Sequence, residues 1–260
     1  MNGLRYITFS AVALFPLFVF SDDAEWGHLT GRFLYDGDPP PAKTVRVTRD
    51  TAAFGDTIHD ESLMVNEKNH GIANIIVYLY PKDDELPVHP SYALTANSKV
   101  ELAMQNGRFV PHILLLRTTQ TMTLCNKDKV VHNARIDFLR NTPMSPASPA
   151  RNSLELHYSE EERFPCPVAC AIHPWMRGFV LLRSDPYMAK TDTNGRFMIK
   201  NLAVGEHVFR LWHERTGFLR DVRVGPLTTD SRGRLTVTIR NGHNELTDTR
   251  LAPKMFVRDD

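Results

Sequence analysis

Four side chains of the types that bind soft metal ions occur in two short segments of the chain. Cys170, His173 and Met176 follow one another at intervals of three residues, directly before an apolar run over residues 178–182 that is typical of a strand. His132 lies upstream in the segment NKDKVVHN, at the expected end of another strand. A thiolate and two imidazoles suit a trigonal plane around copper, to which a thioether adds a weak axial contact. The pattern therefore predicts a mononuclear copper site whose ligands are His132, Cys170, His173 and Met176.

The chemistry of such a site is one-electron transfer. Sulfur ligands stabilise Cu(I) and imidazoles hold Cu(II), so a single copper ion can cycle between the two states in one compromise geometry. Pro174, directly after His173, restricts the loop and limits its rearrangement. No Ser/His/Asp arrangement, phosphate-binding glycine loop or paired-carboxylate motif stands out in the sequence. We therefore expect an electron carrier rather than an enzyme.

The elements that must position these ligands are predicted to be strands. Residues 234–240 alternate polar and apolar side chains without error, and residues 119–124 show the same period of two. Residues 73–80 have the continuous apolar character of a buried strand. Further strands are expected at residues 196–200 and 206–213, with Asn194-Gly195 as a two-residue hairpin turn before the first of them. No stretch keeps a convincing helical period, so the predicted fold class is all-β, built from sandwiches.

The ligand segments resemble those of the amicyanin- and plastocyanin-like cupredoxins, which are blue-copper proteins. The stretch CAIHPWMRG, from Cys170 to Gly178, is similar to the short Cys-x2-His-x2-Met ligand loop of the amicyanin-like members. Upstream, the resemblance rests on the segments FVPHI (109–113), TMTL (121–124), NKD (126–128) and HN (132–133), and it covers residues 96–184. It implies a Greek-key sandwich in which His132 is the first imidazole ligand. It also implies that Asn133 hydrogen-bonds to tie the two ligand segments together.

The cysteines leave open alternatives beside this site. The chain has three, Cys125, Cys166 and Cys170, which is an odd number for an oxidising compartment. The Cys-x3-Cys spacing of Cys166 and Cys170 is similar to a binuclear copper (CuA) loop. That loop, however, has three residues between its second Cys and its His, whereas this chain has two. Alternatively, Cys125 and Cys166 could form a disulfide near the site and leave Cys170 for the metal. His112 and His213 are weaker candidates for extra metal contacts.

A second module is predicted on either side of the first. Residues 26–38 and 191–205 resemble the opening and the Thr-Asp-x-x-Gly-x-Phe core of the carboxypeptidase regulatory-like, transthyretin-like β-sandwich. We expect one part of this sandwich at residues 24–87, the cupredoxin at 88–186 as an insert or edge-on neighbour, and the other part with the C-terminal strands at 187–255. The combination resembles exported planctomycete proteins of the methylamine-utilisation type. That resemblance does not indicate methylamine as a substrate.

The first residues predict export. Residues 1–21 combine one basic residue, Arg5, with an apolar run over residues 7–20 and small residues before the expected cleavage site, which is typical of a signal peptide. The alternative is an uncleaved N-terminal anchor. Cleavage leaves a mature chain with equal numbers of basic and acidic side chains, so the charge balance favours neither nucleic acid nor an anionic membrane as partner. No later segment is long and apolar enough to span a bilayer. We expect a periplasmic or otherwise exported protein.

The predicted function is one-electron transfer to a redox protein partner. The edge of His173 is expected near the surface as the exit route, with Pro174, Trp175 and Met144 as an apolar docking patch. One alternative is a copper-binding or carrier protein without a redox partner. Another is an envelope- or glycan-binding β-sandwich protein whose copper site is vestigial.

Overall fold

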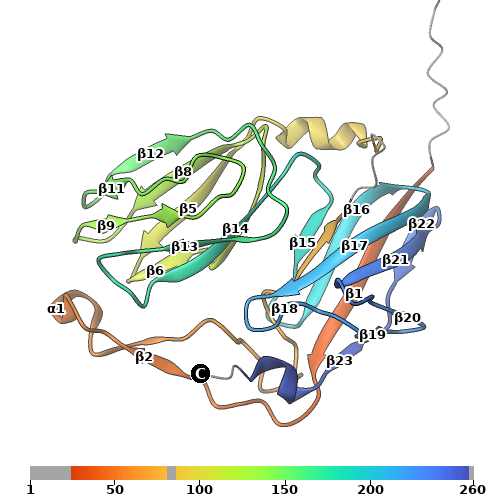
Figure 1. Cartoon of the computed structure of the whole chain (residues 1–260), viewed down its shortest axis with the longest axis horizontal. Coiled ribbons are helices and arrows are strands. Elements are labelled where there is room, and N and C mark those ends of the chain that lie inside the picture. The colour runs from red at the N-terminus through yellow and green to blue at the C-terminus, as the bar shows by residue number, and fades with distance from the viewer. Residues whose placement is uncertain (1–24, 81–85, 258–260) are drawn as a thin grey trace, which may run out of the picture.

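The computed structural model describes residues 25–80 and 86–257, and strands make up most of its regular structure. They form two β-sandwiches that lie beside one another (Figure 1). The prediction of an all-β sandwich fold is confirmed. The expected signal peptide at residues 1–21 lies outside the described residues. Within the described ranges, no helix combines the length and apolar character needed to cross a membrane.

The first sandwich contains the predicted ligand segments and has two four-stranded sheets. One sheet has the order β12 (Ser153–Leu156), β8 (Thr121–Asn126), β5 (Lys99–Gln105) and β6 (Arg108–Val110); the other has β10 (Arg135–Ile136), β13 (Cys166–Ala169), β14 (Arg177–Arg183) and β7 (Ile113–Arg117). A short pair, β9 (His132–Asn133) and β11 (Ala147–Ser148), lies at one end. The alternation in β8 buries Met122 and Leu124 between the sheets, where they pack with Leu102 and Val180.

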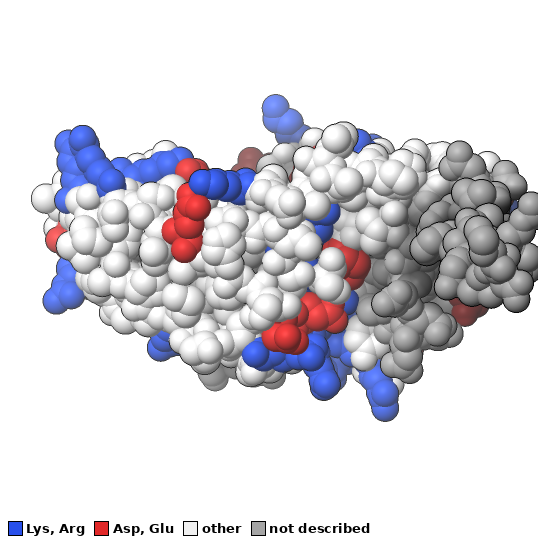
Figure 2. Space-filling view, turned by 90° about the horizontal axis from the view of Figure 1, so that it is seen from above, with Lys and Arg blue, Asp and Glu red and all other residues white. Residues whose placement is uncertain are grey.

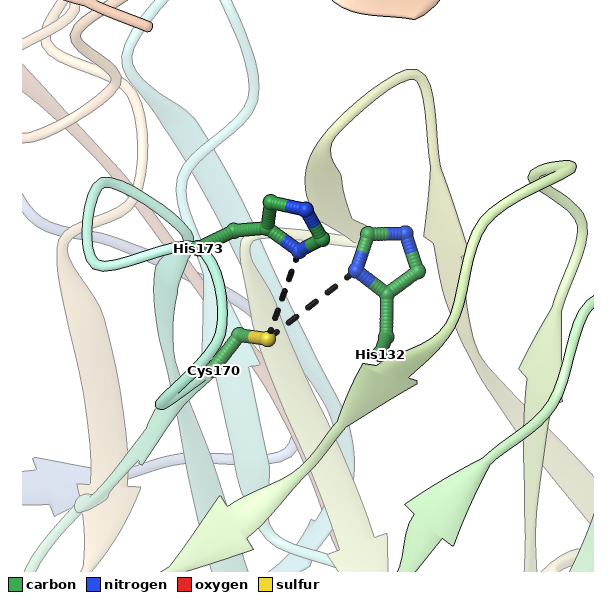
Figure 3. A group of neighbouring side chains, drawn as sticks. All are labelled: His132, Cys170 and His173. Carbon is green, nitrogen blue, oxygen red and sulfur yellow. Dashed lines mark hydrogen bonds between the residues drawn. The ribbon is translucent and has the colours of Figure 1, made fainter. Parts of the chain in front are cut away.

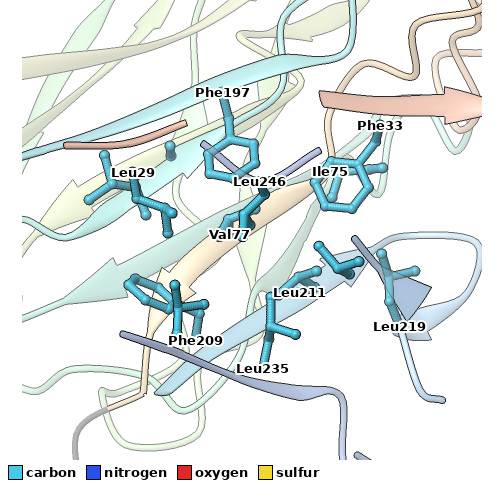
Figure 4. Close-up of a cluster of buried hydrophobic side chains, with 14 of the residues drawn as sticks. Leu29, Phe33, Ile75, Val77, Phe197, Phe209, Leu211, Leu219, Leu235 and Leu246 are labelled. Atoms are coloured by element: carbon cyan, nitrogen blue, oxygen red, sulfur yellow. The ribbon is translucent and has the colours of Figure 1, made fainter. Parts of the chain in front are cut away.

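The second sandwich combines strands from both ends of the chain. One sheet contains β16 (Arg196–Ala203), β1 (Trp26–Tyr35), β22 (Gly242–Glu245) and β23 (Thr249–Leu251); the other contains β15 (Met188–Lys190), β4 (Ile76–Leu79), β17 (Gly205–His213), β18 (Gly217–Phe218) and β21 (Arg234–Ile239). A small hairpin, β19 (Arg223–Val224) and β20 (Leu227–Thr228), lies outside both sheets. Leu29, Phe33, Val77 and Phe209 lie in the core between the sheets (Figure 4). The expected domain boundaries at residues 87/88 and 186/187 stay predictions.

The two sandwiches meet through an apolar contact. Ile76, Tyr78 and Trp212 of the second sandwich pack against Ile113 and Leu181 of the first. Strand β4 is therefore buried on both faces, because its alternate residues also enter the core of its own sandwich. This double burial explains why residues 73–80 form a continuous apolar run rather than an alternating one.

A hairpin-like segment leaves the second sandwich and reaches the first. Strand β2 (Thr44–Arg46) pairs antiparallel with β3 (Thr57–His59), and the short helix α1 (Thr51–Phe54) lies between them. We call residues 44–59 the arm. It runs below the end of the first sandwich that contains β9 and β6 (Figure 1). Two 3-10 helices complete the fold, η1 (Pro90–Thr95) before the first sandwich and η2 (Pro253–Phe256) near the C-terminus.

The predicted hairpin at Asn194-Gly195 is wrong. A turn is present, closed by the Gly195 amide donating to the Asp192 carbonyl at 2.9 Å, and Gly195 takes the positive φ of 76°. However, β15 pairs with β4 and β16 pairs with β1, so the turn carries the chain from one sheet to the other. Asp192 organises this crossing because its carboxylate accepts the Asn194 and Arg196 amides.

Charged side chains are mixed on the surface. Where Figure 2 shows described residues, basic and acidic groups are interspersed among broad uncharged stretches. This agrees with the nearly balanced totals of 31 basic and 30 acidic residues in the whole chain.

Candidate metal centre

Three of the four predicted ligands meet at one end of the first sandwich (Figure 3). The Cys170 Sγ lies 3.9 Å from the His132 Nδ1 and 3.7 Å from the His173 Nδ1. Ligand atoms of the three residues all lie within 4.8 Å of one another, and all three side chains are buried. Among the described residues, no other group of three or more His, Cys, Asp or Glu side chains is arranged closely enough to hold a metal ion.

The loop between β13 and β14 positions two of these residues. The pairing of Ala169 with Arg177 brings the two strands together, and the Cys170 amide donates to the Met176 carbonyl at 3.2 Å. A second bond, from the Met176 amide to the His173 carbonyl at 2.9 Å, closes a turn within the loop. Met176 is buried in the same apolar cluster as Cys170. Its role as the axial ligand stays a prediction.

Asn133 joins the two segments that carry the ligands, as the cupredoxin resemblance implied. Its Oδ1 accepts a hydrogen bond from the Ala171 amide at 2.7 Å and lies 3.3 Å from the Cys170 Sγ. Its backbone amide donates to the same sulfur at 3.5 Å. Its side-chain amide donates to the Ser145 hydroxyl at 2.8 Å. The sulfur therefore lies among polar groups that are themselves held in place.

Each imidazole has a carboxylate on the side away from the sulfur. The Asp128 Oδ2 lies 2.9 Å from the His132 Nε2, and the Asp50 Oδ2 lies 2.8 Å from the His173 Nε2. A hydrogen bond from Nε2–H to a carboxylate selects the tautomer whose Nδ1 lone pair is free. Both free lone pairs then face the Cys170 Sγ. Neither carboxylate was among the predicted site residues.

Burial favours the neutral form of one candidate ligand. It lowers the pKa of His132 below the ordinary value, and the neighbouring His173 ring acts in the same direction. The hydrogen bond to Asp128 opposes this shift without reversing it. Since a metal binds the deprotonated ring nitrogen, a low pKa reduces the competition from protons.

The structure corrects the expected exit route. The His173 side chain has no exposed surface. The Phe54 ring of the arm lies against it with 5.5 Å between ring centroids, and it also lies 5.9 Å from the His132 ring. Of the expected docking patch, Pro174 is exposed, while Trp175 and Met144 are half-buried. An exposed edge of His173 is therefore not the route by which electrons would leave this site.

The cysteine alternatives are also resolved. All three cysteines are free, so the Cys125–Cys166 disulfide is wrong. The Cys166 Sγ lies 3.4 Å from the Phe164 carbonyl oxygen and is not part of the ligand group, so the binuclear site is wrong as well. Burial raises the pKa of Cys166 to about 12, and the nearby Glu162 carboxylate adds to the shift. Cys166 therefore stays a thiol and fills space in the core.

The two additional histidines have other contacts. The His112 Nε2 lies 2.5 Å from the Glu214 Oε1. The His213 Nδ1 accepts the Arg215 amide at 3.2 Å, and its ring packs edge-on against Phe256. Neither belongs to the ligand group, so the predicted extra contacts are wrong.

The donor set suits copper. It offers one soft sulfur and two imidazole nitrogens that face one another in a buried site, which fits the His2Cys arrangement of a type 1 copper centre. No family model matches the chain, and no curated protein matches it either.

Solved structures are similar to part of the chain. A mutant of amicyanin, in its Cu(I) form, has 18% identity and a TM-score of 0.30, over 33% of this chain and 82% of that one. Over about a third of its length, the chain is similar to cupredoxins. A novel purple cupredoxin from Nitrosopumilus maritimus has 22% identity and a TM-score of 0.27, over 33% of this chain and 99% of that one. A copper-containing nitrite reductase (NirK) from Thermus scotoductus SA-01 has 18% identity and a TM-score of 0.29, over 40% of this chain but 25% of that one.

Proposed function

We propose that this chain is an exported blue-copper protein that transfers single electrons through one copper ion. Its ligands in this proposal are His132, Cys170, His173 and Met176. One observation carries the proposal: a buried cysteine sulfur and two histidine Nδ1 atoms converge from separate segments within 4.8 Å of one another. Such a set suits the interconversion of Cu(I) and Cu(II), which is the chemistry that copper would supply there.

The protein's part in this function is to hold the donors still. Asp128 and Asp50 orient the two imidazoles, and Asn133 connects the sulfur to both ligand segments. Because the ligands are buried and tied by hydrogen bonds, little rearrangement accompanies a change of charge at the site. The set of donors therefore favours fast electron transfer over substrate activation.

Export and a redox partner complete the proposal. The composition of residues 1–21 supports export. Exposed Pro174 and half-buried Trp175 lie on the loop that also carries Cys170 and His173, so a partner docking there would approach the metal closely. Redox encounters of this kind are small and weak, which suits a patch of a few side chains.

A second candidate is a protein that binds or carries copper without a redox partner. The covered edge of His173 favours it, since Asp50 and Phe54 occupy the side of the ring through which electrons would otherwise leave directly. The two candidates differ in how readily the bound copper exchanges electrons. An intense visible absorption that is bleached and restored reversibly supports electron transfer, whereas a colourless Cu(I)-only site supports the carrier.

The test is to add Cu(II) to the mature protein and record its optical and EPR spectra. We expect a thiolate-to-copper charge-transfer band that disappears in Cys170→Ser. The matched controls are Cys166→Ser and Cys125→Ser, which remove thiols outside the ligand group and should leave the band in place. A spectrum unchanged in Cys170→Ser would contradict the proposal, as would loss of the band in Cys125→Ser alone.

A further inference from the structure

The arm brings a charged residue to the metal centre from far away in the sequence. Asp50 lies 123 positions before His173, between β2 and α1, yet its carboxylate is 2.8 Å from the Nε2 of that ring. An Asp at a helix N-terminus commonly caps it with its side chain. Here the Asp50 side chain makes no such capping bond to α1, and its backbone takes a left-handed φ of 53°. The carboxylate is therefore directed at the histidine instead of at its own helix.

A second residue of the arm closes the site. Phe54, at the end of α1, packs against His132, His173 and Trp175, with ring centroids 5.5 to 6.3 Å away. The contact depends on Gly107, since a Cβ atom there would lie 2.8 Å from the Ile58 Cδ1 and 3.2 Å from the Phe54 Cδ1. The arm thus lies directly on the backbone of the first sandwich.

The base of the arm is anchored by ion pairs to both sandwiches. Glu61 pairs with Arg108 of the first sandwich at 3.5 Å. Asp60 pairs with Arg215, which follows β17 of the second sandwich, at 3.2 Å. Arg215 also donates to the Ser62 hydroxyl at 2.7 Å. These contacts fix the point from which the arm extends, so Asp50 is held near His173 by more than its own hydrogen bond.

We propose that the arm completes the metal centre. Asp50 is a positioning residue that holds the His173 ring with its Nδ1 toward the Cys170 sulfur, and Phe54 seals the ligands from water. The inference deepens the proposed copper function and rests on it for its consequences in the metal-bound protein. Its structural core, the orientation of His173 by a carboxylate from the arm, concerns the metal-free protein and stands independently.

The first test reads the tautomer of His173 in the metal-free protein by long-range 1H–15N NMR. We expect the wild type to hold the proton on Nε2, and Asp50→Ala to show a mixture of Nε2-H and Nδ1-H forms. Asp50→Asn should restore the Nε2-H form, because its Oδ1 can still accept the hydrogen bond. The matched control is Asp56→Asn, which neutralises an exposed carboxylate on the same arm. A tautomer unchanged in Asp50→Ala would overturn the proposal.

The second test measures Cu(II) and Cu(I) affinities by chelator competition. Loss of a carboxylate behind a metal-binding histidine typically costs about 10–100-fold in affinity, and we expect Asp50→Ala to fall in this range for Cu(II), with a smaller loss for Cu(I). A tenfold difference between the two losses raises the reduction potential by about 59 mV. Losses equal to those of Asp56→Asn would overturn the role of Asp50 at the metal. If the wild type binds no copper, the proposed function fails while the tautomer result still stands.

The seal is tested with Phe54→Ala. We expect Cys170 in the metal-free variant to react several times faster with an alkylating reagent, followed peptide by peptide in the mass spectrometer. Cys125, which is half-buried on β8 with its sulfur 3.4 Å from the Ser153 hydroxyl, is the internal control and should react at an unchanged rate. Equal Cys170 rates in the wild type and Phe54→Ala would overturn the sealing role. Faster reaction of both cysteines would do so too, since it reports general unfolding.

Discussion

The two histidines of the candidate centre are held by equivalent carboxylates of different origin. Asp128 lies four residues before His132, and its side chain is 9% exposed. It also accepts the backbone amides of Asn106 at 2.7 Å and Gly107 at 3.0 Å. Asp50 comes from the arm, and its side chain is 39% exposed. The same contact with a ring nitrogen is thus built once from inside the sandwich and once from outside it.

The difference separates two roles of such a carboxylate that usually coincide, support of the fold and support of the metal site. A buried carboxylate that accepts backbone amides supports the fold as well as the metal site, because its loss leaves those amides without a partner. The half-exposed carboxylate of Asp50 leaves only one group, the His173 ring nitrogen, without a partner when it is removed. In the proposed copper site, the Asp128 side would therefore couple metal binding to stability, whereas the Asp50 side would let metal binding change at a smaller cost in stability.

The largest expected effect follows from Asp128→Ala. The substitution leaves the amides of Asn106 and Gly107 and the His132 Nε2 without their acceptor. Because hydrogen bonds to charged groups contribute about 1.5–3 kcal/mol each, we expect the free energy of unfolding to fall by about 3 kcal/mol. Asp50→Ala removes one acceptor, the partner of the buried His173 Nε2, and should lower it by about 1 kcal/mol. Urea unfolding of the metal-free variants measures both, and equal losses would break the comparison.

A smaller effect is expected where the arm touches the first sandwich. Gly107→Ala places a Cβ against Ile58 and Phe54 at a residue with φ 65°, so it both strains the backbone and pushes the arm away. The control is Gly55→Ala, at φ 74°, where a Cβ would meet nothing within 4 Å. We expect Gly107→Ala to lower the free energy of unfolding by about 1 kcal/mol through its positive φ. Gly55→Ala should cost somewhat more, about 1–3 kcal/mol, because the ψ of −168° at Gly55 belongs to a region that is essentially restricted to glycine.

The two variants should differ at the metal centre. Only Gly107→Ala should also show the mixed His173 tautomers that are expected for Asp50→Ala, because only there is the arm displaced. The same NMR measurement on the metal-free protein checks this. Matching spectra for Gly107→Ala and Gly55→Ala would mean that the arm tolerates the added methyl group, and that docking on Gly107 does not set the position of Asp50.

The parts of the site that the sequence could predict are those with local spacing. Cys170 and His173 lie three residues apart on one loop, and His132 ends a short segment with recognisable polar neighbours. Asp128 could have been predicted, since it lies four residues before His132 and belongs to the segment NKD (126–128), on which the cupredoxin resemblance partly rests. Asp50 could not have been predicted, because no sequence pattern relates it to the His173 ring, 123 residues away. Its approach depends on how the arm folds back.

The fold shows the same division between local and distant information. The apolar run at residues 73–80 correctly predicted a buried strand, because a strand buried on both faces needs consecutive apolar residues and not alternating ones. The turn at Asn194-Gly195 was located correctly, but its two strands enter different sheets. Turn residues determine how the chain bends, whereas the sheet that each strand joins depends on partners such as β1 and β4, more than 100 residues away.

The smallest effect concerns the base of the arm, where His112 lies between two carboxylates. Its Nε2 is 2.5 Å from the Glu214 Oε1, and its Nδ1 is 3.9 Å from the Glu61 Oε2. Burial alone would lower the pKa of His112, and Lys190 acts in the same direction. The hydrogen bond and charge of Glu214, together with Glu61, outweigh both and raise it above the ordinary value.

Because the folded protein holds this proton more tightly than the unfolded chain, the stabilisation is complete below the ordinary histidine pKa of about 6.5. It is lost as the pH rises through the raised pKa of the folded state. Urea unfolding at several pH values measures this. Across this range we expect the free energy of unfolding of the wild type to fall by up to about 1 kcal/mol more than that of His112→Gln. Asp50→Ala should retain the full pH dependence, since its carboxylate lies at the other end of the arm. Parallel profiles for the wild type and His112→Gln would show that the base of the arm is held by its other ion pairs, Arg108–Glu61 and Arg215–Asp60, and owes nothing to the charge of His112.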